Sequence, residues 1–348
     1  MKALFVTSST SDVDSLVRAW DCWQPDKSTR VMFPHMGEPR DEEILAVARK
    51  MLPDIIFYIG ANEGSGIPSM KTFLDLRKLA PSINLCCDAG DTPWYEPLRR
   101  YKKAGCFSLQ VALDGYLDAP VDLVTVTPVD PAPYIQPVEW ERFIRCGFSG
   151  GVSSKERLAV FKVSFAGRMP PKIVKRRPHN ALPAWKPLYK KHPDIPPPVP
   201  VTQRDKIVWG LENMEDVITV RRRTSKAPYS DHVAFMQSCQ IIINTSTSGT
   251  GDTHHIKGRV LEAGWAKCAL LESAGSPIAK WLPEESYFIY HDADHARDLI
   301  KSLTTEQITK SALALNEYVK NHYHPRQIYG EILERAGLVD HPIAITPT

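Results

Sequence analysis

The sequence predicts an α/β fold made of two domains, each a parallel sheet flanked by helices. The chain has 348 residues, which exceeds one average domain and suits two of about 150 residues each. Residues 1–128 alternate strand and helix patterns, and this alternation is typical of a Rossmann-like sheet. Residues 233–272 contain the order strand, loop, helix and strand again, so the second half of the chain predicts a sheet of the same kind.

The first domain is predicted to occupy residues 1–128. An acidic run at 41–43 would open a helix, because acidic side chains are favoured in the first turn. Residues 8–11 are Ser-Ser-Thr-Ser and contain no Gly-x-Gly-x-x-Gly motif, so a dinucleotide is not expected in this half. Strands are predicted at 3–7, 30–33, 54–59, 83–87, 107–112 and 123–127, and helices at 13–23, 41–51, 69–79 and 95–104.

Two polar loops follow strands of this domain, at residues 60–66 and 88–95. The second loop sets Asp88 and Asp91 beside two aromatic residues. Carboxylates beside aromatic rings at a strand's carboxyl end suit sugar recognition, because rings stack on a pyranose while acids bind its hydroxyls. Asp91 could instead cap the next helix. For Asp88, a functional and a structural role both stay open.

A phosphate-binding arrangement is predicted within residues 241–271. A β-branched strand leads into a loop of small Gly and hydroxyl residues at 245–253, and a helix follows. Lys257 and Arg259 stand before this helix. A helix N-terminus beside cations and a flexible polar loop can hold phosphate. Glu262, in the first helical turn, is poorly explained by core packing and could accept hydrogen bonds from a ribose.

Composition and charge are those of an ordinary globular protein. Hydrophobic residues make up 43% of the chain and charged residues 24%, enough to bury two cores. The formal net charge of +3 is too small to indicate a nucleic-acid partner by itself. Basic residues cluster at 172–177 and 221–223, where solvated loops and a surface for polyanions both stay open.

Cysteine usage and hydropathy indicate a cytoplasmic protein. Seven cysteines are scattered without Cys-x-x-Cys spacing, which favours a reducing compartment. The N-terminal apolar run is too short for a signal peptide, and no stretch approaches the roughly 20 apolar residues of a membrane-spanning helix.

Neither a metal nor a cofactor is expected. The pairs at His254-His255 and His322-x-His324 lack a Glu at zincin spacing and lack Cys partners. The chain also has no Gly-x-Ser-x-Gly elbow and no Walker loop, which argues against hydrolases and P-loop enzymes.

The phosphate-binding stretch also carries a family resemblance. Its order is Ser-x-x-Ile-Ile-Ile-Asn, loop, Lys-Gly-Arg-Val-Leu-Glu-Ala, then apolar-Leu-Leu-Glu. This order resembles the donor-site segment of GT-B glycosyltransferases, in the group 1 branch that includes spore-protein-like transferases. The Pro-rich stretch at 126–134, which cannot be a helix or central strand, resembles the point where GT-B chains leave the first domain.

The resemblance implies a GT-B fold, in which two Rossmann-like domains face each other across a cleft. The second domain would begin with a strand at 163–167. The Pro-rich tract at 170–200 departs from the family, whose members usually have a regular helix there, and its part at 185–200 would be an inserted loop or a partner contact. The predicted parts are an acceptor domain at 1–128, a linker and crossover at 129–160, a nucleotide-sugar-binding domain at 161–303, and C-terminal helices returning across the domains at 304–348.

The resemblance also implies a role for each matched residue. Glu262 would bind the ribose, and Lys257 and Arg259 would lie near the diphosphate. Glu272 would belong to the donor pocket. His254 stands where many relatives carry a Glu, so the sequence does not decide whether the anomeric configuration is kept. The candidate catalytic residues are Asp88, Lys257 and Arg259; the donor-binding candidates are Gly167, Arg168, Lys172, Thr245, Ser246, His254, Lys257, Arg259, Glu262 and Glu272; the acceptor-side candidates are Asn62, Glu63 and Asp91.

The sequence thus predicts a metal-independent glycosyltransferase that moves a sugar from a nucleotide-diphosphate sugar to an acceptor. A GT-B-shaped sugar-nucleotide epimerase would use the same donor site without an acceptor. A catalytically inactive nucleotide-sugar-binding protein is the third possibility. The acceptor could be a glycan, a protein or a modified nucleic-acid base, and the sequence leaves the sugar and the oligomeric state open.

Overall fold

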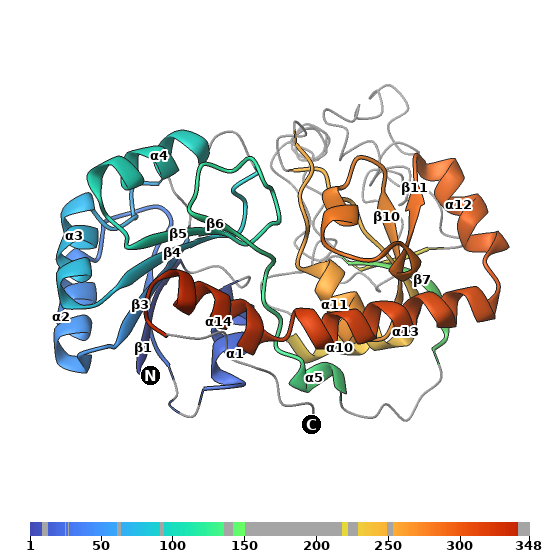
Figure 1. Ribbon diagram of the computed structural model, residues 1–348, viewed down its shortest axis with the longest axis horizontal. Coiled ribbons are helices and arrows are strands. Elements are labelled where there is room, and N and C mark those ends of the chain that lie inside the picture. Colours follow the sequence, from blue (N-terminus) through green and yellow to red (C-terminus); the bar gives the residue numbers. More distant parts are fainter. Residues whose placement is uncertain are drawn as a thin grey trace, which may run out of the picture.

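The computed structural model contains two α/β halves (Figure 1). The structure describes residues 1–8, 13–24, 26, 28–60, 64–90, 94–135, 142–149, 218–221, 229–248 and 253–339. Each half is built on one parallel sheet, as the alternating sequence pattern predicts.

The first sheet has six parallel strands in the order β2-β1-β3-β4-β5-β6. Strands β1, β3, β4 and β5 are buried along their whole length, because helices cover both faces of a parallel sheet. The strands are β1 (Ala3–Ser8), β2 (Thr29–Phe33), β3 (Ile55–Ile59), β4 (Ser82–Cys86), β5 (Leu109–Ala112) and β6 (Leu123–Val124), and the helices are α1 (Val13–Asp21), α2 (Asp41–Met51), α3 (Met70–Leu79) and α4 (Tyr95–Ala104).

The second sheet has five parallel strands in the order β11-β10-β9-β7-β8. The chain order reverses between β7 and β9, and ligands of such sheets bind at the carboxyl ends beside that switch point. The strands are β7 (Ile144–Ser149), β8 (Thr219–Arg221), β9 (Cys239–Ile243), β10 (Ala269–Ser273) and β11 (Tyr287–Tyr290). The helical segments are α10 (Tyr229–Ser238), α11 (Arg259–Trp265), η2 (Pro277–Lys280), η3 (Glu284–Ser286) and α12 (Ala293–Ser302).

The second sheet starts earlier in the chain than the sequence analysis expected. Strand β7 and the short helix α5 (Ala132–Ile135) both lie within 129–160, which was interpreted as linker and crossover. The sequence of β7 hides the strand, because Arg145 and Gly147 interrupt its apolar pattern. Gly147 is needed there, since a Cβ would lie 2.3 Å from the Cys239 Sγ. The strand predicted at 163–167 lies outside the described residues.

Two C-terminal helices join the halves. Helix α13 (Thr305–His322) packs on α11, where the Asn316 side chain donates to the Gly264 carbonyl at 2.8 Å. Helix α14 (Pro325–Arg335) then reaches the first domain, where the Tyr329 hydroxyl donates to the Leu16 carbonyl at 2.8 Å. One hydrophobic core therefore spans both halves. Of the helices that the structure describes, none has the length and apolarity needed to span a membrane.

Candidate functional site

The predicted phosphate-binding stretch forms strand β9, a loop and helix α11, followed by strand β10. Helix α11 buries Val260, Leu261 and Ala263 against the core, and this fixes the side of the helix on which its polar residues lie. The carboxyl ends of β7, β9 and β10 converge beside the start of α11, because neighbouring parallel strands end at the same sheet edge. Three hydrogen-bonded networks gather around this edge.

The first network joins Arg259 to Glu272 through Asn244. A guanidinium N–H of Arg259 donates to the Asn244 Oδ1, and the Asn244 Nδ2 donates to the Glu272 Oε2 at 2.6 Å. Glu272 accepts two further bonds from Ser273, from the backbone N–H at 2.9 Å and from the hydroxyl at 3.2 Å. Arg259 also lies over the Phe148 ring, 5.1 Å from its centroid. The Arg259 charge therefore polarises the Asn244 amide, and this strengthens the hydrogen bond from the amide to the buried Glu272 carboxylate.

Burial dominates the titration of Glu272, whose side chain is completely enclosed. Loss of hydration raises the pKa of this carboxyl from 4.5 to about 7, although the Asn244 and Ser273 bonds and the Arg259 charge act in the opposite direction. Glu272 therefore changes charge near neutral pH, which is a property common at functional sites.

The second network contains Glu262, the predicted ribose ligand. Its Oε2 lies 3.0 Å from the Nε2 of His232 on α10, and the Nδ1 of the same ring lies 3.2 Å from the Ser149 hydroxyl at the end of β7. All three side chains are buried. Sequence reasoning missed His232, which contacts Glu262, and Ser149, which contacts His232. The sequence offers one signal for His232: it is a polar residue, three positions after Tyr229, in a helix whose other buried residues are mostly apolar.

The loop between β9 and α11 is folded back on itself. Thr247 and His254 form an antiparallel bridge, and the Ser246 hydroxyl lies 2.9 Å from the His254 Nδ1. Ser246 also contacts Ser273, since its backbone N–H donates to the Ser273 hydroxyl at 3.0 Å. Burial lowers the pKa of His254. His254 therefore holds the loop after β9 in place through its contacts with Ser246 and Thr247.

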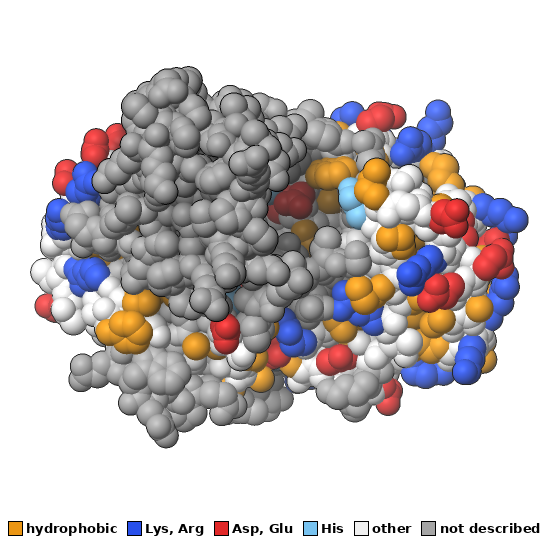
Figure 2. Space-filling view, turned by 180° about the vertical axis from the view of Figure 1, so that it is seen from behind, with side chains coloured by type: hydrophobic (Ala, Val, Ile, Leu, Met, Phe, Trp, Pro, Cys, Tyr) orange, Lys and Arg blue, Asp and Glu red, His pale blue; other side chains and the backbone are white. Residues whose placement is uncertain are grey.

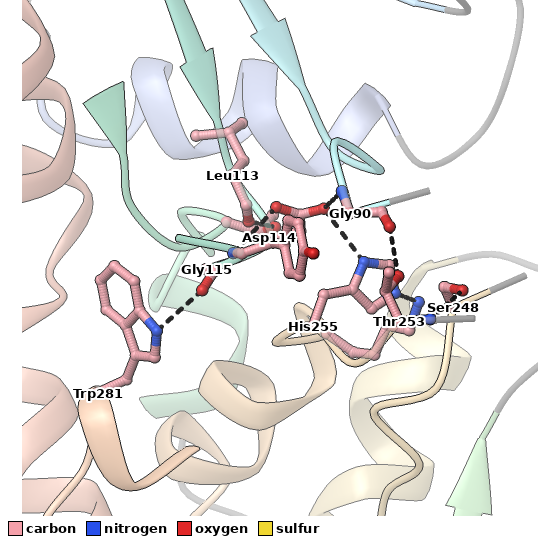
Figure 3. Close-up of polar contacts among 11 residues, drawn as sticks. Gly90, Leu113, Asp114, Gly115, Ser248, Thr253, His255 and Trp281 are labelled. Atoms are coloured by element: carbon pink, nitrogen blue, oxygen red, sulfur yellow. Dashed lines mark hydrogen bonds and ion pairs between the residues drawn. The ribbon is translucent and has the colours of Figure 1, made fainter. Parts of the chain in front are cut away.

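The third network crosses between the domains (Figure 3). Asp114, which follows β5, lies with its Oδ2 3.1 Å from the Nδ1 of His255 in the second-domain loop. The Nε2 of the same ring contacts the Lys257 ammonium. An ammonium group can only donate, so Nε2 is the acceptor and the ring proton lies on Nδ1, facing Asp114. Burial raises the pKa of Asp114 to about 6, against the lowering effect of its bonds and of Lys257.

The backbone around this contact is tightly packed (Figure 3). The Gly90 N–H donates to the Asp114 Oδ2 at 2.7 Å, and the Gly90 carbonyl accepts from the Thr253 hydroxyl. The Gly115 carbonyl accepts from the Trp281 indole at 3.1 Å. Gly115 has φ +64, and a Cβ there would lie 2.8 Å from an Ile256 side-chain atom. The first-domain turn at Gly115 and the loop between β9 and α11 therefore touch without room for a side chain.

The comparisons with known proteins agree with this geometry. Residues 188–334 match the model of the glycosyl transferase-like family. The fold matches the Anabaena protein HepE in complex with UDP-glucose, with a TM-score of 0.58 and 11% identity over 97% of this chain and 100% of that one. It also matches a Rickettsia africae glycosyltransferase, with a TM-score of 0.53 and 10% identity over 96% and 97% of the two chains. Sucrose-phosphate synthase from Thermosynechococcus elongatus has a TM-score of 0.54 and 9% identity over 96% and 99%. No curated protein sequence matches the chain.

The chain therefore has the GT-B fold, and its residues 188–334 match the glycosyl transferase-like family. The predicted resemblance and the two-domain α/β fold are therefore confirmed. The roles of individual residues stay predictions, and the structure reports only where each of them lies.

The structure brings most second-domain candidates to one sheet edge. Thr245, Ser246 and His254 lie in the loop after β9, Lys257 precedes α11 and Arg259 begins it, Glu262 is in its first turn, and Glu272 is on β10. Asp88 is exposed on the first-domain loop after β4, two residues from Gly90. Six candidates lie outside the described residues: Asn62, Glu63, Asp91, Gly167, Arg168 and Lys172.

Charge is mixed on the surface of the protein. On the face that Figure 2 shows, basic and acidic side chains are interspersed over the described residues. Within the described part of the chain, no group of three or more His, Cys, Asp and Glu side chains is placed to hold a metal ion.

Proposed function

We propose that the protein is a glycosyltransferase, which takes a sugar from a nucleotide-diphosphate sugar bound at the carboxyl edge of the second sheet. The observation that carries the proposal is the meeting of two cations, Lys257 and Arg259, with two buried carboxylates, Glu262 and Glu272, at that edge. The complexes of Anabaena HepE with UDP and with UDP-glucose support a donor of this class.

The chemistry is mainly electrostatic. Breaking the bond between the anomeric carbon and phosphate leaves a nucleoside diphosphate with growing negative charge. Lys257 and Arg259 are the described side chains that would stabilise this charge, and losing one such group typically costs roughly 100-fold or more in rate. Helix α11 has only seven residues, so its dipole adds little to these two cations. Glu262 would accept hydrogen bonds from the ribose hydroxyls.

Transfer would take place where the donor-side loop meets the first domain. Thr253 and His255 of this loop contact Gly90 and Asp114, and exposed Asp88 lies on the same first-domain loop as Gly90. Asp88 is therefore the first-domain carboxylate proposed to act near the reacting centre. Acceptors of unknown class would bind on this side, and exclusion of water there would limit hydrolysis of the donor.

Nucleotide binding tests the proposal directly. Titration calorimetry with UDP, GDP and UDP-glucose should give saturable binding to at least one of them, without added metal. Arg259→Met should weaken that binding at least about tenfold, because a charge-assisted contact to phosphate is lost. Lys310→Met, at an exposed position on α13, is the matched control and should bind as the unaltered protein does. Absence of binding to all three ligands would refute the proposal.

Product analysis separates transfer from the alternatives. Incubation with the bound nucleotide-sugar and a panel of sugar, peptide and oligonucleotide acceptors should give a glycosylated product and free nucleoside diphosphate. Conversion of the donor to its epimer without any acceptor would identify an epimerase. Binding with neither reaction across the panel would favour an inactive binding protein.

A further inference from the structure

His232 links two parts of the proposed donor site. It lies on α10, with its Nε2 3.0 Å from the Glu262 Oε2 and its Nδ1 3.2 Å from the Ser149 hydroxyl. Its exposed fraction is 5%, that of Ser149 is 3% and that of Glu262 is 9%. One imidazole ring therefore bridges the end of β7 and the first turn of α11 out of contact with bulk water.

The Tyr229 side chain also packs against the His232 imidazole. The Tyr229 ring lies against it, with centroids 5.8 Å apart, and the Tyr229 hydroxyl lies 2.9 Å from the Tyr134 hydroxyl. The Arg18 guanidinium of the first domain lies 3.9 Å from the centroid of the Tyr229 ring. Packing thus fixes the plane of the imidazole, and both of its nitrogens are committed to hydrogen bonds.

The Glu262 carboxylate determines which ring nitrogen of His232 carries the proton. An ionised carboxylate only accepts, so Nε2 carries the proton and donates to Glu262. Nδ1 of the same tautomer accepts, so the Ser149 hydroxyl donates to it. Glu262 therefore fixes the tautomer of the ring, the Ser149 hydroxyl adapts to it, and the bond from Nε2 to Oε2 orients the carboxylate.

We propose that His232 is a positioning residue that orients the Glu262 carboxylate toward the ribose hydroxyls of the bound nucleotide. The inference rests on the proposed function, since it requires a nucleotide with its ribose at Glu262. It adds a specific consequence: His232 determines how well the protein distinguishes a ribonucleotide from its 2′-deoxy counterpart, without touching either.

Two substitutions of His232 test the roles of its two ring nitrogens separately. The side-chain amide of His232→Gln reaches about as far as Nε2 and can donate to Glu262. The shorter amide of His232→Asn reaches the Nδ1 position and leaves Glu262 without this donor. Exposed His322 at the end of α13 gives the matched control, His322→Asn.

The experiment measures the dissociation constants of UDP and 2′-deoxy-UDP by calorimetry, with GDP and 2′-deoxy-GDP in parallel. The unaltered protein should prefer the ribonucleotide by roughly tenfold, because a hydrogen bond to a charged group is lost with the deoxy ligand. The preference should fall to within about twofold of equality in His232→Asn, and His232→Gln should keep most of it. His322→Asn should leave it unchanged.

The outcomes distinguish the inference from the proposed function. An unaltered protein that binds none of the four nucleotides overturns both. Binding without ribose preference, or a preference that His232→Asn leaves intact, overturns the inference alone. Equal losses of affinity for ribo- and deoxynucleotide would show a general structural role and also overturn it. If His232→Asn fails to fold, as judged by its thermal unfolding, His232→Phe, which keeps a ring and removes both nitrogens, replaces it, and an unchanged preference there is the contradicting result.

Discussion

Replacing Glu272 with Gln should change how the stability of the protein depends on pH. The carboxyl is fully buried, and burial raises its pKa from 4.5 to about 7. Between these two values the folded state holds a proton that the unfolded state has released. Stability therefore falls as pH rises through this window, since the folded protein must then bury a charge. Gln cannot titrate, so the variant lacks this contribution.

The magnitude follows from the two pKa values. Between pH 5 and pH 8, the difference between a folded pKa of about 7 and an unfolded value of 4.5 removes about 2–3 kcal/mol from the free energy of unfolding. Gln also loses a good bond at every pH, because its amide N–H₂ would face either the Asn244 N–H₂ or, in the flipped orientation, the Ser273 N–H. The variant should be less stable than the unaltered protein at pH 5, and the gap should close or reverse at pH 8.

Urea denaturation at pH 5, 6, 7 and 8, followed by tryptophan fluorescence, measures this difference. Glu306→Gln, at an exposed position in the first turn of α13, is the matched control and should show a constant difference across the series. If the difference between the unaltered protein and Glu272→Gln also stays constant within about 0.5 kcal/mol from pH 5 to 8, the argument from burial is refuted.

Three further predictions concern the buried carboxylate Glu272, the contact between the domains and the metal dependence of transfer. Asn244→Asp should destabilise the protein more at pH 8 than at pH 5, because a second buried carboxylate would face Glu272; equal losses at both pH values in thermal unfolding would contradict this. Gly115→Ala should cost about 1–3 kcal/mol more than Gly337→Ala, measured by denaturation. Both glycines have similar positive φ, +64 and +70, but only Gly115 has a neighbour within 4 Å; equal costs would show that the interdomain contact is not tight. Dialysis against EDTA should leave the rate of sugar transfer unchanged, and recovery on adding Mg²⁺ or Mn²⁺ would contradict metal independence.

The sequence predicts the phosphate-binding stretch because its signals are local. Three β-branched residues end at Asn244, small residues follow, and an amphipathic run begins at Arg259. Buried parallel strands need continuous apolar runs, so the first sheet is equally visible in the sequence. Strand β7 is not visible, because Arg145 satisfies the carbonyls of Ile300 and Leu303 from a position where an apolar residue is expected.

The partners of the site residues could not be predicted, because they are distant in the chain. His255 and Asp114 are separated by 141 residues, and each resembles an ordinary loop residue in its own segment. His232 and Ser149 are separated by 83 residues. Local patterns determine which elements form, whereas these contacts exist only after the elements pack and the two domains meet.

Two of the three networks at the site share an arrangement that would suit the binding of a diphosphate. Arg259 reaches Glu272 through the Asn244 amide, and Lys257 reaches Asp114 through the His255 ring. In both cases an uncharged hydrogen-bonding group stands between cation and carboxylate. A phosphate oxygen that takes the place of the amide or the imidazole gains a charge-assisted hydrogen bond to the cation. The displaced group loses a hydrogen bond but carries no charge, which costs much less free energy than leaving a buried carboxylate unpaired. The cations can therefore be satisfied in the empty protein and still be released to the donor.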